Sequence, residues 1–315
     1  MNQLAFLLLL LIGSTCLIAQ TDTTYIPVVA YWDLKDEFHY QVTTINRQVQ
    51  SGALTKNDTS SYSVSLKVLE ANETSYLLSW GLKSNPGVFN VPDYLLQELE
   101  AYTIKKVIYR TTETGEFVGV ENWEEISAIM DQFFDAMAEK YFNEEGRGQE
   151  IEQILAPVRE IYQSKEGIEN LAFDEVQILH FPFGYEYSVS DTLRYEELFP
   201  NMLGGDPIRA NTILYMDSVA MVDSYCSLTE EMELNPDDTR LLVTELFKRM
   251  GLNDKELEDA IATSTIDITD RNRYEVYYDT GLPLRIHTYR KSIIDIPSKD
   301  GNTVNTKEVI IERIE

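Results

Sequence analysis

Cysteine is nearly absent from this sequence. Only Cys16 and Cys226 occur among its 315 residues, and Cys16 lies in an N-terminal apolar segment that we expect to be removed. A single remaining cysteine cannot form an internal disulfide, so the core has to be held by packing alone. A lone cysteine such as Cys226 is more typical of a buried small residue than of a nucleophile.

Histidine and the usual catalytic motifs are equally scarce. The three histidines, His39, His180 and His287, lie far apart in strand-like sequence, without the spacing of a helical metal motif. The sequence contains no C-x-x-C, H-E-x-x-H, G-x-S-x-G, P-loop or G-x-G-x-x-G pattern, and no loop has the alternating acids of a calcium site. We therefore predict no catalytic residues, no metal and no cofactor.

Positive charge is also low. The chain has 26 Lys and Arg residues against 53 Asp and Glu residues, which gives a formal net charge of −27. Nucleic acids and anionic lipid surfaces attract positive faces, so neither is expected as a partner. The excess of acid is typical of a soluble surface in an extracellular or salty setting.

Long apolar runs are confined to the N-terminus. Residues 4–12 are uninterrupted apolar sequence, followed by small residues and by Ala19 before Gln20. This pattern predicts a secretory signal peptide, residues 1–19, that is too short to stay as a membrane anchor. The alternative is a lipoprotein signal with Cys16 acylated. We expect a periplasmic or extracellular protein without a transmembrane segment after signal removal.

Alternation of apolar and polar residues predicts antiparallel strands at both ends of the remaining chain. Residues 62–68 alternate most cleanly, and residues 103–110 and 116–120 form a hairpin around Thr114-Gly115. Residues 272–314 contain two further turns, one of them at Asp300-Gly301, which is a strong hairpin signal.

Helical periodicity dominates the middle of the chain. From Trp123 to Tyr141, apolar residues recur at steps of three and four, and Asn122 with Glu125 resembles a capping box. Further helices are expected near residues 151–162, 166–178 and 236–249. The last of these helices follows Asn235 as its N-cap and has a proline in its first turn.

We predict an α+β fold with one domain over residues 20–315. It consists of a β-rich part (25–120), a helical part (122–180) and a second β-rich part with a helix (185–315). A large antiparallel sheet, arranged as one sheet, two sheets or a half-barrel, is expected to pack on the central amphipathic helix 122–142.

Aromatic residues are abundant, with 19 Tyr and 12 Phe. They are good strand formers that fill sheet–helix interfaces, which is one explanation for their number. The other is an apolar trough under the helices that takes a lipid-like or peptide ligand. The residues predicted to bind such a ligand are Phe181, Phe183, Tyr185, Tyr187, Tyr274 and Tyr277.

Four segments resemble a group of exported proteins common in Bacteroidota. They are Trp32-Asp-Leu-Lys-Asp, Val68-Leu-Glu-Ala-Asn-Glu-Thr-Ser-Tyr, Phe183-Gly-Tyr-Glu-Tyr and Phe199-Pro-Asn-Met-Leu-Gly-Gly-Asp-Pro-Ile. The resemblance implies an envelope or secreted location and no particular activity. The layout of strands around helices is also similar to exported lipoprotein carriers with a half-barrel sheet, a likeness of architecture only.

Three functions remain open from the sequence. The leading hypothesis is a non-enzymatic envelope protein that binds an apolar ligand or another protein through its aromatic-rich sheet. The second is a hydrolase of unfamiliar type that uses scattered carboxylates, with or without His180. It requires at least two acids, or one acid and His180, to converge in one cleft. The third is a structural subunit of an envelope assembly, which requires a large exposed apolar patch.

Overall fold

The computed structural model describes residues 24–82, 102, 104–142, 156–169, 174–199, 201, 206–251, 255–296 and 301–314. The predicted signal peptide, its cleavage site and Cys16 lie outside the described residues. In the described part of the chain, no helix is both long enough and apolar enough to cross a membrane.

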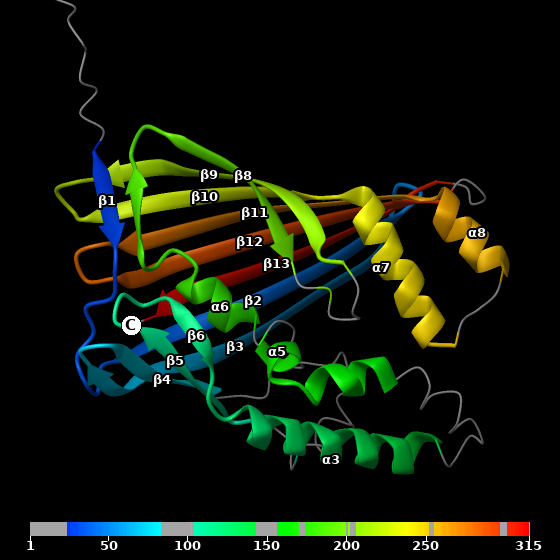
Figure 1. Cartoon of the computed structure of the whole chain (residues 1–315), viewed down its shortest axis with the longest axis horizontal. Helices are drawn as coiled ribbons and strands as arrows, with labels where there is room; N and C mark the ends of the chain where they lie inside the picture. Colours follow the sequence, from blue (N-terminus) through cyan, green and yellow to red (C-terminus); the bar gives the residue numbers. More distant parts are fainter. Residues whose placement is uncertain are drawn as a thin grey trace, which may run out of the picture.

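Eleven antiparallel strands form one large open sheet (Figure 1). Its first group contains β2 (Glu37–Gln50), β3 (Ala53–Asn72), β4 (Ser75–Leu82), β5 (Lys106–Thr112) and β6 (Phe117–Val120). Its second group contains β8 (Thr192–Phe199), β9 (Ile208–Ala220), β10 (Tyr225–Leu234), β11 (Thr265–Tyr277), β12 (Leu282–Asp295) and β13 (Thr303–Ile314). The spatial order is β6-β5-β4-β3-β2-β13-β12-β11-β10-β9-β8.

The junction between the two groups is the pairing of β2 with β13. It runs from Gln50 opposite Thr303 to His39 opposite Ile314. The two β-rich ends of the chain therefore belong to a single sheet, and the predicted large antiparallel sheet is confirmed. The edges β6 and β8 stay apart, so the sheet is open.

A second, two-stranded sheet pairs β1 (Tyr25–Val28) with β7 (Tyr185–Ser188) in antiparallel register. In Figure 1 it lies in front of the β9–β11 end of the large sheet. β7 contacts β9 there. This crossing creates the space described in the next section.

Alternation gives the large sheet one apolar face, which we call the inner face. Tyr40 and Val42 of β2, Leu66 of β3, Ile286 of β12 and Val309 of β13 are all buried on it. Successive strand residues point to opposite faces, so the residues between these ones point away from the core. The predicted alternation of residues 62–68 is confirmed by burial of Tyr62, Val64, Leu66 and Val68.

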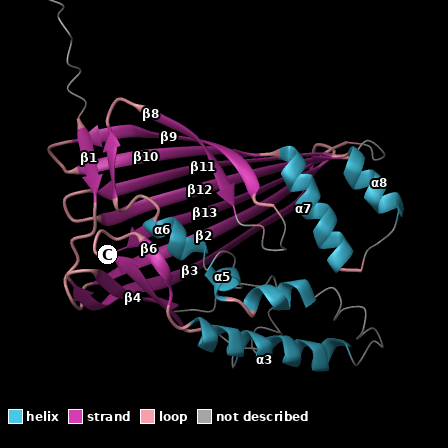
Figure 2. Cartoon of the chain, viewed as in Figure 1, coloured by secondary structure: helices cyan, strands magenta, loops and turns pink. Residues whose placement is uncertain are grey.

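The helices are α3 (Trp123–Phe142), α5 (Lys165–Gly167), α6 (Asp174–His180), α7 (Pro236–Arg249) and α8 (Lys255–Thr263), and residues 156–162 are also helical. Figure 2 shows α5 and α6 in front of the sheet, whereas α3 lies below it in the same view. α6 contacts β12, a middle strand. The helix that lies over the centre of the sheet is therefore α6, and α3, which we expected there, lies to one side.

The apolar stripe of α3 is nevertheless buried. Ile126 is fully covered, and Phe134 packs edge-on against Tyr162 of the neighbouring helical residues with ring centroids 5.9 Å apart. Arg159 of the same segment bonds to Asp131 and Asp135 on α3. A second helix thus covers much of the stripe, which is why α3 does not need the middle of the sheet. The side chains of Met137 and Tyr141 lie outside the described residues.

Local expectations are met in part. The Asn122 side chain contacts Glu125 as expected, because its Nδ2 donates to Glu125 Oε2 (3.2 Å), and its oxygen accepts a hydrogen bond from Ile108 N (2.8 Å), which ties the helix start to β5. His180 ends α6 and is not in a strand. The other cap is as predicted, because Asn235 accepts from Asp237 N and Asp238 N at the start of α7.

Candidate functional site

A cavity of about 530 Å³ lies between α6, β7 and the inner face of β8 and β9. We call it the aromatic cavity, because six rings line it: Phe117, Phe181, Phe183, Tyr185, Tyr187 and Tyr195. Leu193 and Leu214 add aliphatic surface, and the polar lining consists of Glu116, Glu186, Glu197, Gln177 and His180. Tyr185 and Leu193 are more than half exposed, so they mark the mouth.

A tight turn between α6 and β7 positions the rings of the floor. Phe183 N donates to His180 O (3.1 Å), and Gly184 N donates to Val28 O (2.9 Å). Gly184 has φ +88°, and a Cβ there would collide with Glu116. This left-handed conformation favours glycine.

Four of the six predicted ligand-binding residues line this cavity. They are Phe181, Phe183, Tyr185 and Tyr187. Tyr274 lies behind the wall, where its ring stacks on Phe181 with centroids 4.8 Å apart. Tyr277 does not line the cavity, since it is three residues from Tyr274 on one strand and so faces the opposite side of the sheet.

The edge strand β8 supplies lining residues that the sequence reasoning missed. Leu193, Tyr195 and Glu197 alternate toward the cavity, while Arg194 and Glu196 take the other face. This period of two was the available signal. It was weak because every residue of β8 from Thr192 to Glu196 is exposed, so no apolar face stands out.

A buried carboxylate supports the back of the floor. Glu230 of β10 accepts hydrogen bonds from Tyr274 Oη (3.1 Å) and Asn272 Nδ2 (2.8 Å). Both partners are neutral, and burial raises the pKa of the Glu230 carboxyl from 4.5 to about 7. The floor of the cavity therefore rests on an acid that is only partly charged near neutral pH.

His180 forms a fixed cross-link in the cavity wall. Its Nδ1 lies 2.9 Å from Gly115 O, and its Nε2 lies 2.8 Å from Tyr109 Oη. A carbonyl oxygen can only accept, so Nδ1 carries the proton and Nε2 accepts from the Tyr109 hydroxyl. Burial lowers the pKa of His180 to about 4, so the ring is neutral at neutral pH.

The carboxylates of the cavity contact neutral groups. Glu197 accepts from Thr212 Oγ1 (3.3 Å), and burial raises the pKa of its carboxyl. Glu116 accepts from the hydroxyls of Thr114 (3.4 Å) and Thr112 (3.5 Å). No lysine or arginine is present among the described residues that line the cavity. Its interior thus combines apolar rings with negative charge.

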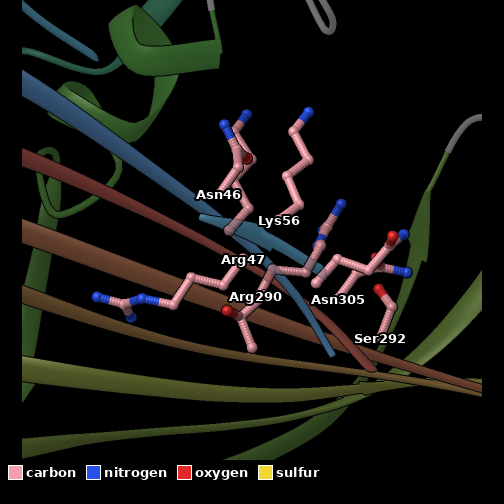
Figure 3. A pocket seen from close by; sticks show the side chains of 9 residues that line it. Asn46, Arg47, Lys56, Arg290, Ser292 and Asn305 are labelled. Atoms are coloured by element: carbon pink, nitrogen blue, oxygen red, sulfur yellow. The ribbon is translucent and has the colours of Figure 1, made fainter. Parts of the chain in front are cut away.

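A second hollow has a volume of about 300 Å³, and Figure 3 shows side chains that line it. We call it the polar cleft. β2, β3, β12 and β13 supply its lining, which includes the four cations Arg47, Lys56, Arg290 and Lys307.

Each cation of the polar cleft has a carboxylate partner. Arg47 pairs with Glu308 (2.7 Å), Lys56 with Asp58 (3.1 Å), Arg290 with Asp270 (2.6 Å) and Lys307 with Asp174 (3.4 Å). The positive charge of the cleft is therefore balanced within the protein.

The geometry of the described residues gives little support for metal binding, for a reactive thiol or for hydrolysis. Among the described residues, no group of three or more His, Cys, Asp or Glu side chains is placed to hold a metal ion. Cys226 is buried, and burial raises the pKa of its thiol to about 12. His180 and Glu116 do share one cavity, as the hydrolase hypothesis requires, but both ring nitrogens of His180 are already hydrogen-bonded.

Comparison with known proteins gives no family. No family model matches the chain, and no curated protein matches it. A solved structure showing lipid–protein interactions in lipovitellin aligns with 90% of this chain at 8% sequence identity and a TM-score of 0.43. The aligned part is 26% of the lipovitellin chain. A similarity at this level supports no conclusion about function.

Proposed function

We propose that this chain is an exported, non-enzymatic protein that binds a small apolar ligand in the aromatic cavity. The observation that carries the proposal is the convergence of six rings from four parts of the chain on one open space of about 530 Å³. Protein interiors are normally close-packed, so an aromatic hollow of this size is the default ligand site in a protein without other signatures.

The construction of the cavity supports binding over a packing defect. Its floor is rigid, because Phe181 stacks on the buried Tyr274 and Tyr187 Oη donates to Pro182 O (3.0 Å). Its mouth is open, with Tyr185 and Leu193 reaching solvent. A rigid floor with an exposed apolar rim lets a ligand enter without unfolding the wall and keeps the ordering cost of binding low.

Export rests on the N-terminal sequence. The proposal places the signal peptide at residues 1–19, in keeping with the resemblance to exported proteins of Bacteroidota. N-terminal sequencing of the protein recovered from its host should begin at Gln20. A chain that keeps its first nineteen residues in the cytoplasm would contradict export and leave the cavity proposal untouched.

Filling the mouth of the cavity tests ligand binding. We expect Leu193→Trp to weaken binding of the neutral apolar dye Nile red by about tenfold, because the larger ring occupies the entrance. Leu198→Trp is the matched control, since Leu198 is 59% exposed on the same strand but does not line the cavity. Fluorescence titration measures both variants. Equal dye binding by the two variants, or none by the wild type, would contradict the proposal.

The natural occupant can be examined in the same pair of variants. Native mass spectrometry of protein purified from its host should show a bound apolar species with the wild type and with Leu198→Trp, and less of it with Leu193→Trp. The hydrolase and envelope-subunit hypotheses stay predictions.

A further inference from the structure

The chemistry of the aromatic cavity narrows the class of ligand. Resting on the proposed function, we infer that the ligand is an organic cation, an alkylated ammonium group attached to an apolar body. A neutral lipid or a fatty acid is the competing occupant. The inference depends on three properties of the cavity: its rings, its carboxylates and the state of its histidine.

Aromatic faces attract cations. The face of each ring carries negative potential, and several rings around one space form the usual receptor for a quaternary ammonium group. Tyr185 and Tyr187 meet edge to face with centroids 6.4 Å apart, and Tyr195 lines the same space from β8. Burial raises the pKa of Tyr195 to about 12, so its phenol stays neutral. The rings therefore offer faces and hydroxyl oxygens and carry no charge themselves.

The carboxylates add an attraction that only a cation can use. Glu197 is half-buried and accepts from the neutral Thr212 hydroxyl, and this burial raises the pKa of its carboxyl. A positive ligand group beside it stabilises the charged form, whereas a fatty-acid carboxylate would be repelled by Glu197, Glu116 and Glu186 together. The negative charge of the cavity thus selects for the sign of the ligand.

No lining group offsets this preference. The described lining contains no lysine or arginine, and His180 is neutral because burial lowers its pKa to about 4. The polar cleft has the opposite arrangement, in which four cations face four carboxylates of the protein. The net charge of −27 also draws cations toward the molecule over a distance set by the salt concentration.

Three probes with the same alkyl chain separate the sign of charge from apolar attraction. They are octyltrimethylammonium, 1-octanol and octanoate, each titrated calorimetrically below the concentration at which it forms micelles. We expect the cation to bind about tenfold more tightly than octanol, because the ring faces attract a desolvated cation and not an uncharged hydroxyl group. Octanoate should bind more weakly than octanol.

Paired variants on β8 locate the effect. Glu197→Gln keeps an oxygen to accept from Thr212 and removes the charge, so it should weaken octyltrimethylammonium about fivefold and leave octanol unchanged. Glu196→Gln changes the net charge by the same amount on the outer side of the strand, and it should bind all three probes like the wild type. Thermal unfolding of both variants checks that they remain folded.

The outcomes distinguish this inference from the proposed function. Equal affinity for octanol and the cation, or equal loss in the two glutamine variants, would overturn the cationic ligand while octanol binding still supports an apolar site. Failure of all three probes to bind, together with no difference between Leu193→Trp and Leu198→Trp, would overturn both. The expected order of affinities, with the preference for the cation reduced in Glu197→Gln and kept in Glu196→Gln, supports both.

Discussion

The aromatic cavity and the polar cleft lie along the same large sheet, but their charged side chains have different kinds of partner. In the cleft, each arginine or lysine side chain has a carboxylate of the protein within 3.4 Å. In the cavity, Glu197 and Glu116 accept only from neutral hydroxyls among the contacts described above. The cations of the cleft are therefore paired with carboxylates of the protein, whereas these two carboxylates of the cavity are bonded to neutral groups.

The contrast is sharpest for two buried acids on neighbouring strands. Asp270 of β11 receives two hydrogen bonds from Arg290, at 2.7 and 2.6 Å. Glu230 of β10 receives bonds only from the neutral groups of Asn272 and Tyr274 among its described contacts. One acid is paired with a cation, whereas burial of the other favours its protonated form. A buried acid without a cationic partner costs stability.

The largest predicted effect is the pH dependence of stability through Glu230. The native pKa of about 7 exceeds the ordinary value of 4.5, so the folded protein retains a proton that the unfolded chain has lost. Stability should therefore fall as pH rises from about 4.5 to 7, by about 3 kcal/mol in full.

Glu230→Gln tests this directly. The amide oxygen still accepts from Asn272 and Tyr274, so the variant should lose this pH dependence and be the more stable protein at pH 8. Glu233→Gln, an exposed residue on the same strand, is the control and should follow the wild type. Urea unfolding at pH 5, 6, 7 and 8 measures the slopes. A wild-type slope retained by the Glu230→Gln variant would refute the assignment.

The next effect concerns the balanced acid. Arg290→Met leaves Asp270 buried, at 6% side-chain exposure, without its cation, and we expect a loss of about 2–3 kcal/mol in unfolding free energy. Lys56→Met breaks a pair in which both side chains are at least 43% exposed, and it should cost less than about 0.5 kcal/mol. Denaturant titration compares them. Equal losses of unfolding free energy in the two variants would mean that burial does not make one ion pair of the cleft more stabilising than the other.

The smallest effect tests the rigidity of the cavity floor. Tyr187→Phe removes the hydroxyl that donates to Pro182 O and should cost about 1 kcal/mol, because it leaves a buried carbonyl unsatisfied. Tyr185→Phe, at the exposed mouth, should cost less than about 0.3 kcal/mol. If thermal unfolding shows the same change for both, the Tyr187 bond does not stiffen the floor.

Much of the sheet could be predicted from local sequence. Gly281 and Gly301, each from a predicted turn, have positive φ, and alternation identifies the strands β11, β12 and β13 around them. The rings of residues 181–187 also lie together as predicted, because one turn and one short strand carry them. Tyr277 does not line the cavity, because strand parity, and not closeness in the sequence to Tyr274, decides which face of the sheet a residue takes.

The polar half of the site could not be predicted in this way. Glu116, Glu186 and Glu197 come from three separate elements, and only the crossing of β7 over β9 brings them to one cavity. The central position of α6 was missed for the same reason. The seven residues of α6 are too few to show a clear helical periodicity. The longer α3 shows a clear apolar stripe, but another helix covers it.

The pairing of β2 with β13 also decides when the molecule can finish folding. Arg47 and Glu308, which bond across this pairing, are 261 residues apart in the sequence. Completing the sheet therefore joins segments that are synthesised at very different times. Until β13 is available, β2 and β12 each present a bare strand edge to their surroundings. Long-range pairings of this kind form slowly, so the newly made chain passes through a stage in which these edges are open to wrong partners.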